Sequence, residues 1–337
     1  MARNIRYLIL LLTNRCNLNC SYCYRGAQKS GCSMSRNVAI KAISIAARSG
    51  KPFHLQLSGG EPTMEPELIE WVAWYIRSNG FAASIGIQTN GTRLDDAFAK
   101  VFRKYDIQVG ISLDGTPEIN DVQRGETSKV LKGMNILSNK KIGFRVTTVI
   151  TDRNIFDLSR LILMLGSYPW MSGIGFDLLV KKGNALISPE LNLPDPDNLK
   201  EGLQEFVEAL EWINRRRRFP ISVREIELLR RKKGRTSFCH AAAGESMAVT
   251  PSGEIYPCSQ TSDDPDFFCG TVDHPEFHRL DMLGKYRLER DECSVCNLAG
   301  VCPGECPGRL YYNGLETSGL ACSIYRTLWS CLGGDNI

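Results

Sequence analysis

Short apolar runs alternate with longer amphipathic stretches through the first two-thirds of this 337-residue chain. Such runs form strands and such stretches form helices, so the alternation predicts βα units around a parallel sheet. The predicted strands are Arg6–Leu12, Phe53–Leu57, Ser84–Gln88, Gln108–Leu113, Gly143–Ile150 and Gly175–Leu179. The predicted helices are Ser35–Ser49, Glu65–Ser78, Leu94–Lys104, Thr127–Asn139, Phe156–Leu165 and Asp197–Arg215. Because a closed barrel has eight such units, we expect an α/β fold with a partial, open (β/α)6 TIM barrel.

The composition changes after Pro220. Residues 236–337 hold nine of the thirteen cysteines, many Gly and Pro, and few long apolar periods. Turns such as Pro251-Ser252-Gly253 divide this region into short pieces. We expect two domains: residues 1–219 form the barrel, and residues 220–337 form a small, loop-rich domain without a large hydrophobic core. The basic run Arg215–Arg218 fits a solvated helix end or a docking surface for an acidic peptide.

The cellular compartment determines what thirteen cysteines can do. The apolar run Tyr7–Leu12 has six residues. A signal-peptide core needs roughly 7–15 residues and a membrane helix about 20, so we expect a cytoplasmic protein. Disulfides are disfavoured there, and an odd cysteine count does not suit a pure disulfide framework. A net charge of +4 is too small to indicate nucleic acid or a membrane as a partner.

Three cysteines directly follow the first predicted strand. Cys16, Cys20 and Cys23 have the spacing C-x3-C-x2-C. Three thiolates on one tight loop can hold three irons of a [4Fe–4S] cluster and leave the fourth iron open. A structural zinc site closes its shell with four ligands, often as paired CxxC units, so zinc fits this triplet poorly.

With the aromatic Tyr22 directly before its third cysteine, the triplet resembles the signature of the radical S-adenosylmethionine (radical SAM) enzymes. The resemblance implies that the open iron chelates the amino and carboxylate groups of SAM. Reductive cleavage would then give a 5′-deoxyadenosyl radical that removes a hydrogen from the substrate. Cys16, Cys20 and Cys23 would be both metal ligands and catalytic residues.

Further segments at the ends of successive predicted strands strengthen the resemblance. They are Ser58-Gly59-Gly60-Glu61-Pro62, Gln88-Thr89-Asn90-Gly91, Ser112-Leu113-Asp114-Gly115 and, beyond the strands, Arg124. Each alone also fits a bare turn or a surface charge. In order, they resemble the family's SAM site: glycines that let the backbone approach the SAM amino group, Glu61 as its acceptor, Ser112 at the ribose and Arg124 at the carboxylate. The implied cofactor-binding residues are Tyr22, Ser58, Gly59, Gly60, Glu61, Asn90, Ser112, Asp114 and Arg124.

The later cysteines have a second characteristic spacing. Cys239 is followed by x13-Gly253-x4-Cys258, and then by Cys293-x2-Cys296-x5-Cys302-x3-Cys306-x15-Cys322. This order resembles the SPASM domain, the C-terminal extension of radical SAM enzymes that modify peptides and proteins. In isolation the four cysteines from Cys293 to Cys306 also fit a zinc ribbon.

The SPASM resemblance implies two auxiliary [4Fe–4S] clusters, and hence three in all. The inner cluster would take Cys239, Cys258 and Cys306, and the outer one Cys293, Cys296, Cys302 and Cys322. Sulfatase-maturing members have a further cysteine where this chain has Glu245, so the inner cluster lacks one thiolate. Either Cys269 supplies it, or the site is open to a substrate thiol or a small molecule. Cys32 and Cys331 are expected to be ordinary thiols.

The resemblance implies a peptide- or protein-modifying maturase, with a thioether or another crosslink as the first expectation. Formylglycine formation is the alternative, but Ser259 stands where sulfatase maturases place an aspartate base. Serine has no useful pKa near neutrality. Asp177 and Asp114 are candidates to face the substrate cavity, and Asp177 is the candidate acid or base, although each also fits a structural role.

A non-enzymatic iron–sulfur electron carrier is the alternative of another class. It does not explain an open first cluster beside a complete SAM-binding set. The expected partners are a peptide or protein substrate and a reductant such as flavodoxin or ferredoxin. Because the first predicted strand begins near Arg6, we expect a separate leader-binding protein, or the barrel mouth and SPASM loops, to recognise the peptide.

Overall fold

A parallel-dominated sheet organises the computed structural model, which describes residues 3–26, 31–230, 237–288, 291–317 and 319–332. The strands are β1 (Tyr7–Leu11), β2 (Phe53–Ser58), β3 (Ala83–Thr89), β4 (Ile107–Ser112), β5 (Phe144–Ile150), β6 (Met171–Leu178), β7 (Ser222–Val223), β8 (Ser246–Val249) and β9 (Ile255–Tyr256). Within the described residues their order is β7-β6-β5-β4-β3-β2-β1-β8-β9. Every pairing is parallel except that of β8 with β9. Consecutive parallel neighbours bring the carboxyl ends of β1–β6 to one edge.

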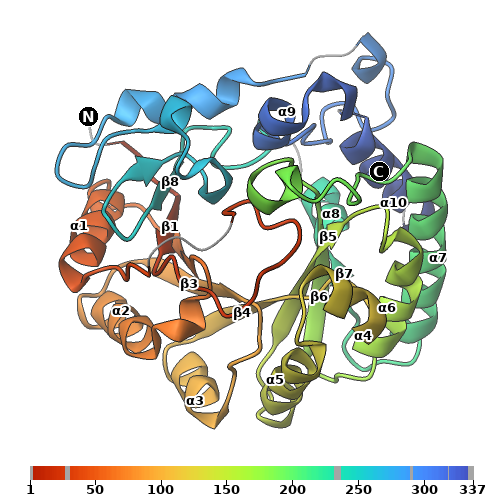
Figure 1. Cartoon of the computed structure of the whole chain (residues 1–337), viewed down its shortest axis with the longest axis horizontal. Helices are drawn as coiled ribbons and strands as arrows, with labels where there is room; N and C mark the ends of the chain where they lie inside the picture. Colours follow the sequence, from red (N-terminus) through yellow and green to blue (C-terminus); the bar gives the residue numbers. More distant parts are fainter. Residues whose placement is uncertain (1–2, 27–30, 231–236, 289–290, 318, 333–337) are drawn as a thin grey trace.

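The helices are α1 (Arg36–Ala47), α2 (Pro66–Ser78), α3 (Asp96–Lys104), α4 (Pro117–Gln123), α5 (Thr127–Asn139), α6 (Leu158–Leu165), α7 (Pro196–Asn214), α8 (Arg224–Arg230), α9 (Pro307–Asn313) and α10 (Leu320–Leu332). In Figure 1, helices α1, α2, α3, α5, α6 and α7 lie on the outer side of the sheet. The starts of α1 and α3 are fixed locally: Ser35 accepts a hydrogen bond from the Val38 amide, and Asp95 accepts one from the Phe98 amide. No helix in the described ranges is both long and apolar enough to cross a membrane.

All six predicted strands and all six predicted helices are present, and α5 has the predicted bounds. The bounds of most other elements differ by one or two residues, and two elements of the first region depart further from expectation. Strand β6 begins at Met171 rather than Gly175, because glycines 173 and 175 lie inside a strand whose other residues are mostly buried. Helix α4 was not predicted; Pro117 begins it at a position where proline is tolerated.

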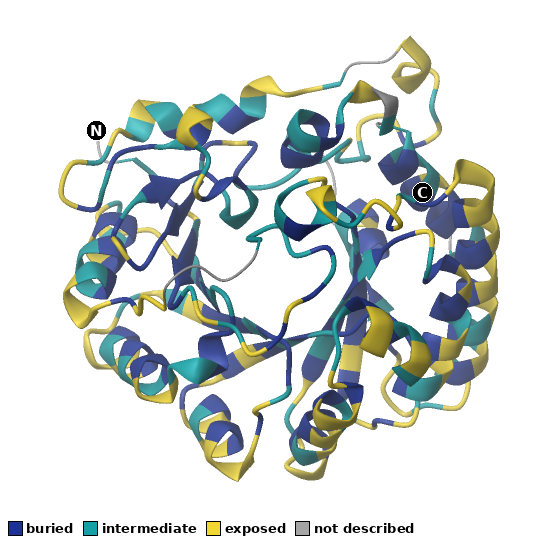
Figure 2. Cartoon of the chain, viewed as in Figure 1, coloured by how far each residue is buried: buried dark blue, intermediate teal, exposed yellow. Residues whose placement is uncertain are grey.

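The expectation of a C-terminal region without a large core was wrong. Strand β8 pairs in parallel with β1, and β7 pairs with β6, so the sheet continues past residue 219. Helix α10 packs on α7 and buries Leu320, Ile324 and Leu328 in the main core. Figure 2 shows buried residues along α10 and along one side of α7, whose other side is exposed. The division into domains at residues 219 and 220 stays a prediction.

The basic run after α7 contains one residue with a structural role. The guanidinium of Arg217 donates to the carbonyls of Gly166, Tyr168 and Met171 at 2.7–2.9 Å, and so ties the end of α7 to the turn that leads into β6. Its neighbour Arg216 is exposed and stacks on Trp212, 3.9 Å from the ring centroid. The basic run Arg215–Arg218 therefore includes one arginine that links α7 to the turn before β6, as well as solvated cations.

We expect Arg217→Ala to lower the unfolding free energy by about 1.5–3 kcal/mol, because it removes the hydrogen bonds from a charged donor to backbone carbonyls. The matched control, Arg216→Ala, removes an exposed guanidinium of the same run and should change stability by about 0.5 kcal/mol or less. Differential scanning calorimetry of the two variants measures the difference between their melting temperatures. Equal melting temperatures would contradict this role of Arg217.

Candidate cluster and cofactor site

The loop that follows β1 places Cys16, Cys20 and Cys23 at the carboxyl edge of the sheet. The Cys23 amide donates to the Cys20 carbonyl at 3.1 Å, which closes a tight turn between the two thiols. Buried Asn184, on the segment after β6, donates from its backbone to the Cys23 carbonyl and from its side chain to the Cys20 carbonyl, both at 2.9 Å. A distant segment therefore fixes the loop. Sequence reasoning missed Asn184.

The three thiols lie close enough to affect one another. Burial, above all, raises the pKa of Cys16 to about 11, and the nearby charges of Glu61, Cys20 and Cys23 add to the shift. Across the described ranges, no three His, Cys, Asp or Glu side chains are placed to hold a single metal ion. A [4Fe–4S] cluster requires a different arrangement, because each thiolate ligates its own iron. The donor set fits that cluster.

The segment after β2 packs directly on the cysteine loop. The amides of Gly60 and Glu61 donate to the carbonyls of Thr13 and Arg15, each at 2.8 Å. A Cβ at residue 60 would lie 2.2 Å from the Arg15 carbonyl oxygen, and Gly59 has a φ of +136°. Glycine is thus required at both positions by the approach of the cysteine loop itself, whatever these glycines do for a ligand.

Glu61 joins the ends of β2 and β3. It is 1% exposed. Its Oε1 accepts from the hydroxyls of Thr63 and Thr89, both at 2.6 Å, and its Oε2 accepts from the Asn90 amide at 2.7 Å. A carboxylate has capacity for further donors beyond these. Glu61 therefore has a positioning role in addition to the predicted contact with a ligand amine.

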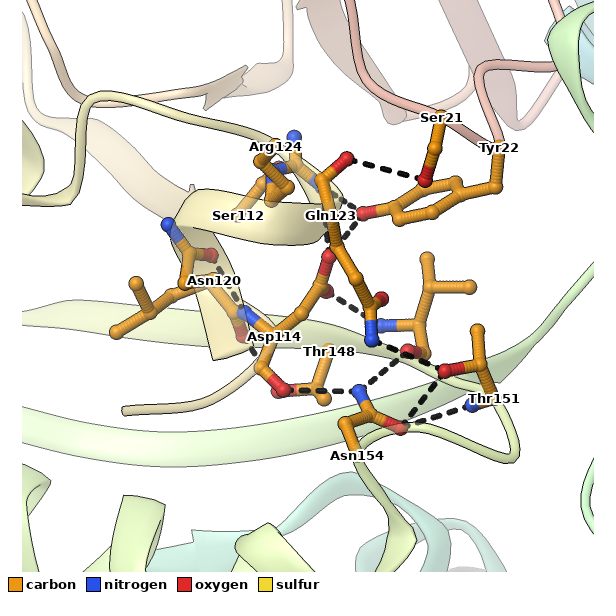
Figure 3. A network of polar contacts seen from close by, with 12 residues as sticks. Ser21, Tyr22, Ser112, Asp114, Asn120, Gln123, Arg124, Thr148, Thr151 and Asn154 are labelled. Carbon is orange, nitrogen blue, oxygen red and sulfur yellow. Dashed lines mark hydrogen bonds and ion pairs between the residues drawn. The ribbon is translucent and has the colours of Figure 1, made fainter. Parts of the chain in front are cut away.

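Tyr22, Asp114 and Arg124 form one buried polar network, which Figure 3 shows with its neighbours. The Tyr22 hydroxyl donates to Asp114 and accepts from Arg124. Asp114 also accepts from the Val149 amide at 2.9 Å and lies 3.5 Å from the guanidinium of Arg124. Burial raises the pKa of Asp114, although the charge of Arg124 acts in the opposite direction.

The same network links Tyr22, which directly precedes Cys23, to the ends of β4 and β5. Asp114 is 0% exposed and is not among the residues that line the cavity, whereas Tyr22 and Arg124 line it. Asn154 donates to the Asp114 carbonyl at 2.8 Å and so holds the β4 end from the other side. The structure thus places Asp114 beneath the site, as a residue that positions Tyr22 and Arg124.

A cavity of about 580 Å³ opens above these residues. Its lining includes Cys16, Cys20, Cys23, Tyr22, Ser58, Gly59, Gly60, Glu61, Asn90, Ser112, Arg124, Asp177, Cys239, Cys258 and Cys306. The first cysteine triplet and three of the later cysteines therefore share one chamber. Burial raises the pKa of Cys258 to about 12, and the charges of Cys239 and Cys306, which line the same cavity, act in the same direction.

The other four cysteines of the later set form a separate group. Burial raises the pKa of Cys302, and Cys322, Cys296 and Cys293 contribute by their charges. Cys293, Cys296, Cys302 and Cys322 are absent from the described lining of the large cavity. The SPASM resemblance implies the same four cysteines as one ligand set, and that assignment stays a prediction.

Cys269 lies in the main hydrophobic core. It is 1% exposed, and its sulfur is 3.2 Å from the Phe267 carbonyl oxygen. It does not line the cavity that contains Cys239, Cys258 and Cys306. The side chain of Glu245 faces His240 at 3.1 Å and Arg6 at 3.6 Å, and it also lies outside the lining. Cys32 is exposed and Cys331 is half-buried.

Asp177, at the end of β6, lines the cavity as predicted but is already paired. Its Oδ1 accepts from Arg224 at 3.0 Å. Arg224 also binds Glu225 at 2.8 Å. This ion pair with Arg224 fits the structural role that the sequence also allowed for Asp177. Arg224 and Glu225 were missed, since nothing in their local sequence places them at a site.

Comparison with known proteins finds a family that matches the first part of the chain and relatives that match most of it. Residues 10–165 match the radical SAM superfamily. An uncharacterized protein of Methanocaldococcus jannaschii is 33% identical over 266 residues, which are 77% of this chain and 86% of that protein. The serine-type anaerobic sulfatase-maturating enzyme of Klebsiella aerogenes is 22% identical over 350 residues, covering 92% of this chain and 81% of the enzyme.

Among solved structures, native anSMEcpe with bound AdoMet and Cp18Cys peptide matches with a TM-score of 0.76 at 20% identity, over 97% of this chain and 96% of that one. At that identity the match shows a shared fold.

We expect Tyr22→Phe to lower the melting temperature, because it removes a buried hydroxyl that links Arg124 to Asp114 and leaves both charges less well paired. The expected loss is about 1–3 kcal/mol. Tyr75→Phe on α2 is the control, since its ring stacks on Trp71 outside the network and should keep that contact. The melting temperatures are measured by differential scanning calorimetry. A decrease no larger than that of Tyr75→Phe would show that the network does not stabilise the fold.

Proposed function

Since this chain belongs to the radical SAM superfamily, we propose that it is a maturase that reductively cleaves SAM and modifies a peptide or protein. It is an enzyme of the radical SAM type with a [4Fe–4S] cluster and SAM as cofactors. The observation that carries the proposal is the single chamber, lined at one end by Cys16, Cys20 and Cys23 and elsewhere by three of the later cysteines.

The chain's own residues account for cofactor binding in this proposal. Cys16, Cys20 and Cys23 hold the cluster, which, when bound with SAM, supplies the 5′-deoxyadenosyl radical that removes a substrate hydrogen. Arg124, held by Asp114 and Tyr22, presents a fixed positive charge for the SAM carboxylate. Ser112 and Asn90 supply hydroxyl and amide groups from the ends of β4 and β3, and Glu61 accepts from the SAM amine.

The sheet is, on this proposal, a partial (β/α)6 barrel, and the region after residue 220 is a SPASM domain with two auxiliary clusters. The support is the grouping of the cysteines, three in the large cavity and four apart from it. The inner cluster takes Cys239, Cys258 and Cys306. The outer cluster takes Cys293, Cys296, Cys302 and Cys322.

A peptide is the proposed substrate, and the supporting observation is the peptide bound in the matching anSMEcpe structure. We place crosslink formation, with a thioether first, ahead of formylglycine formation. Ser259 lines the cavity where an aspartate base would be needed for the latter. The similarity to a sulfatase-maturating enzyme keeps formylglycine as the alternative.

The inner cluster is proposed to keep one iron free for a substrate thiol. The candidate protein ligand Cys269 lies outside the cavity lining, and so does Glu245, which stands where sulfatase maturases have a cysteine. A metal-bound thiol loses its proton readily, so such a site would activate a substrate cysteine without an aspartate base.

The reductant, a flavodoxin or ferredoxin, a separate leader-binding protein and the cytoplasmic location remain proposals from the sequence. An electron carrier of the same composition would not cleave SAM. Dithionite-reduced protein should form 5′-deoxyadenosine, and a candidate peptide should lose two hydrogens for each crosslink. An aldehyde detected in the peptide with a hydrazide reagent would favour formylglycine formation.

The triple variant Cys16→Ala/Cys20→Ala/Cys23→Ala should lower the iron content from about twelve to about eight per chain, four for each cluster. It should abolish 5′-deoxyadenosine formation, while the absorbance of the auxiliary clusters persists. Iron analysis and product chromatography on reconstituted protein measure both. Wild-type product formation in this variant, or wild-type protein with about four irons, would contradict the proposal.

Cys269→Ala should keep the full iron content, because its sulfur lies in the core and away from the inner cysteines. The matched variant, Cys258→Ala, should lose or distort the inner cluster. Electron paramagnetic resonance of the reduced proteins separates the clusters. Loss of the inner-cluster signal in Cys269→Ala, with the signal kept in Cys258→Ala, would show that the ligands are assigned wrongly.

A further inference from the structure

A second cavity of about 240 Å³ adjoins the large one. It lies among the end of β6, helix α8, Arg309 of α9 and helix α10. Six residues line both cavities: Asp177, Leu178, Arg224, Phe238, Cys239 and Arg309. A group that extends from the proposed reaction chamber past these residues would enter the second cavity.

The second cavity contains a buried carboxylate with unused hydrogen-bonding capacity. Glu225 lines it and is 3% exposed. Its Oε1 accepts from the Phe176 amide at 3.1 Å and from Arg224 at 2.9 Å. Its Oε2 is buried and has no hydrogen-bond partner among the described residues. A buried acceptor left without a donor is costly, so a ligand that supplies a donor would be favoured here.

The charges around this cavity favour a cation as that donor. Arg224 is paired with both Asp177 and Glu225, at 3.0 and 2.8 Å. Arg309 is paired with Glu305, at 2.6 Å. Among the described residues, this ion-paired group holds the carboxylates of Asp177, Glu225 and Glu305 and the guanidiniums of Arg224 and Arg309, so it has one more negative than positive charge. The two arginines do not bar a cation, because their charges are already neutralised.

The remaining walls suit an alkyl chain. Leu228 of α8 and Ala321, Ile324 and Tyr325 of α10 line the second cavity. Apolar walls beside a carboxylate oxygen that has no hydrogen-bond partner among the described residues are complementary to a lysine side chain. Its methylene stem packs on apolar surface, and its ammonium group binds a charged acceptor.

We propose that this cavity is a subsite for a lysine-like basic side chain of the peptide, whose ammonium group binds the Glu225 carboxylate. The inference rests on the proposed function, since it presumes a peptide in the adjoining chamber. It assigns a specificity role to Glu225: a substrate would carry a basic residue close to the position that is modified.

The test uses n-butylammonium as the probe and the reconstituted holoenzyme as the protein. Ligand-observed NMR titration should show saturable binding of n-butylammonium and none of butyrate. In Glu225→Gln the amide oxygen is required by Phe176 and Arg224, so the NH₂ group takes the place of Oε2 and affinity should fall at least tenfold. Glu227→Gln, on the same helix but paired with Arg145 and outside both linings, should bind normally.

A second variant, Ala321→Val, fills the cavity from α10 without changing its charge and should also weaken binding; it decides the question if Glu225→Gln does not fold. Crystals soaked in n-butylammonium should show it beside Glu225. Equal affinity in Glu225→Gln and wild type, saturable butyrate binding, or only water in the soaked cavity would overturn the subsite.

Formation of 5′-deoxyadenosine, measured on the same preparations, separates the two proposals. Normal SAM cleavage without amine binding rejects the subsite alone. Amine binding that depends on Glu225, without SAM cleavage in the wild-type protein, supports the subsite and rejects the proposed function.

Discussion

The close backbone contact between the cysteine loop and the end of β2 is the constraint on which the site depends. Gly60 and Glu61 donate to Thr13 and Arg15, and no side chain fits at residue 60. Once the two segments are joined, Glu61 reaches the end of β3. Three strand ends are thereby held in register with one loop, and the cavity forms above them.

The second level of organisation is electrostatic. Asp114 is fully buried, and its charge is acceptable only because Tyr22, Arg124 and the Val149 amide surround it. The same contacts hold the guanidinium of Arg124 in one orientation at the cavity wall. Cys239, Cys258 and Cys306 line the same chamber, and β8, which continues the sheet beside β1, leads to Cys258.

Much of this arrangement could be predicted from the sequence, because it follows from local pattern. Strand and helix periods predicted the order of the first six βα units, whereas the division of the later cysteines into two ligand groups was implied by the SPASM resemblance and stays a proposal. The residues that were missed act over long sequence separations. Asn184 contacts Cys20 and Cys23 across more than 160 residues. Helix α10 was not predicted, because its apolar face is explained only by its packing on the distant helix α7. Asp114 was predicted to bind the cofactor, because a four-residue motif does not show whether its side chain is buried.

The contact from Asn184 has a consequence for how the protein is made. The cysteine loop lies near the start of the chain, yet the carbonyls of Cys20 and Cys23 obtain these partners only after residue 184 has been synthesised and β6 has been added to the sheet. Strand β1, likewise, gains its second neighbour only when β8 emerges. A nascent chain that ends before these elements presents three thiols on an unfinished loop. The loop proposed to hold the cluster therefore obtains its full set of backbone partners late in synthesis, after most of the sheet has been made.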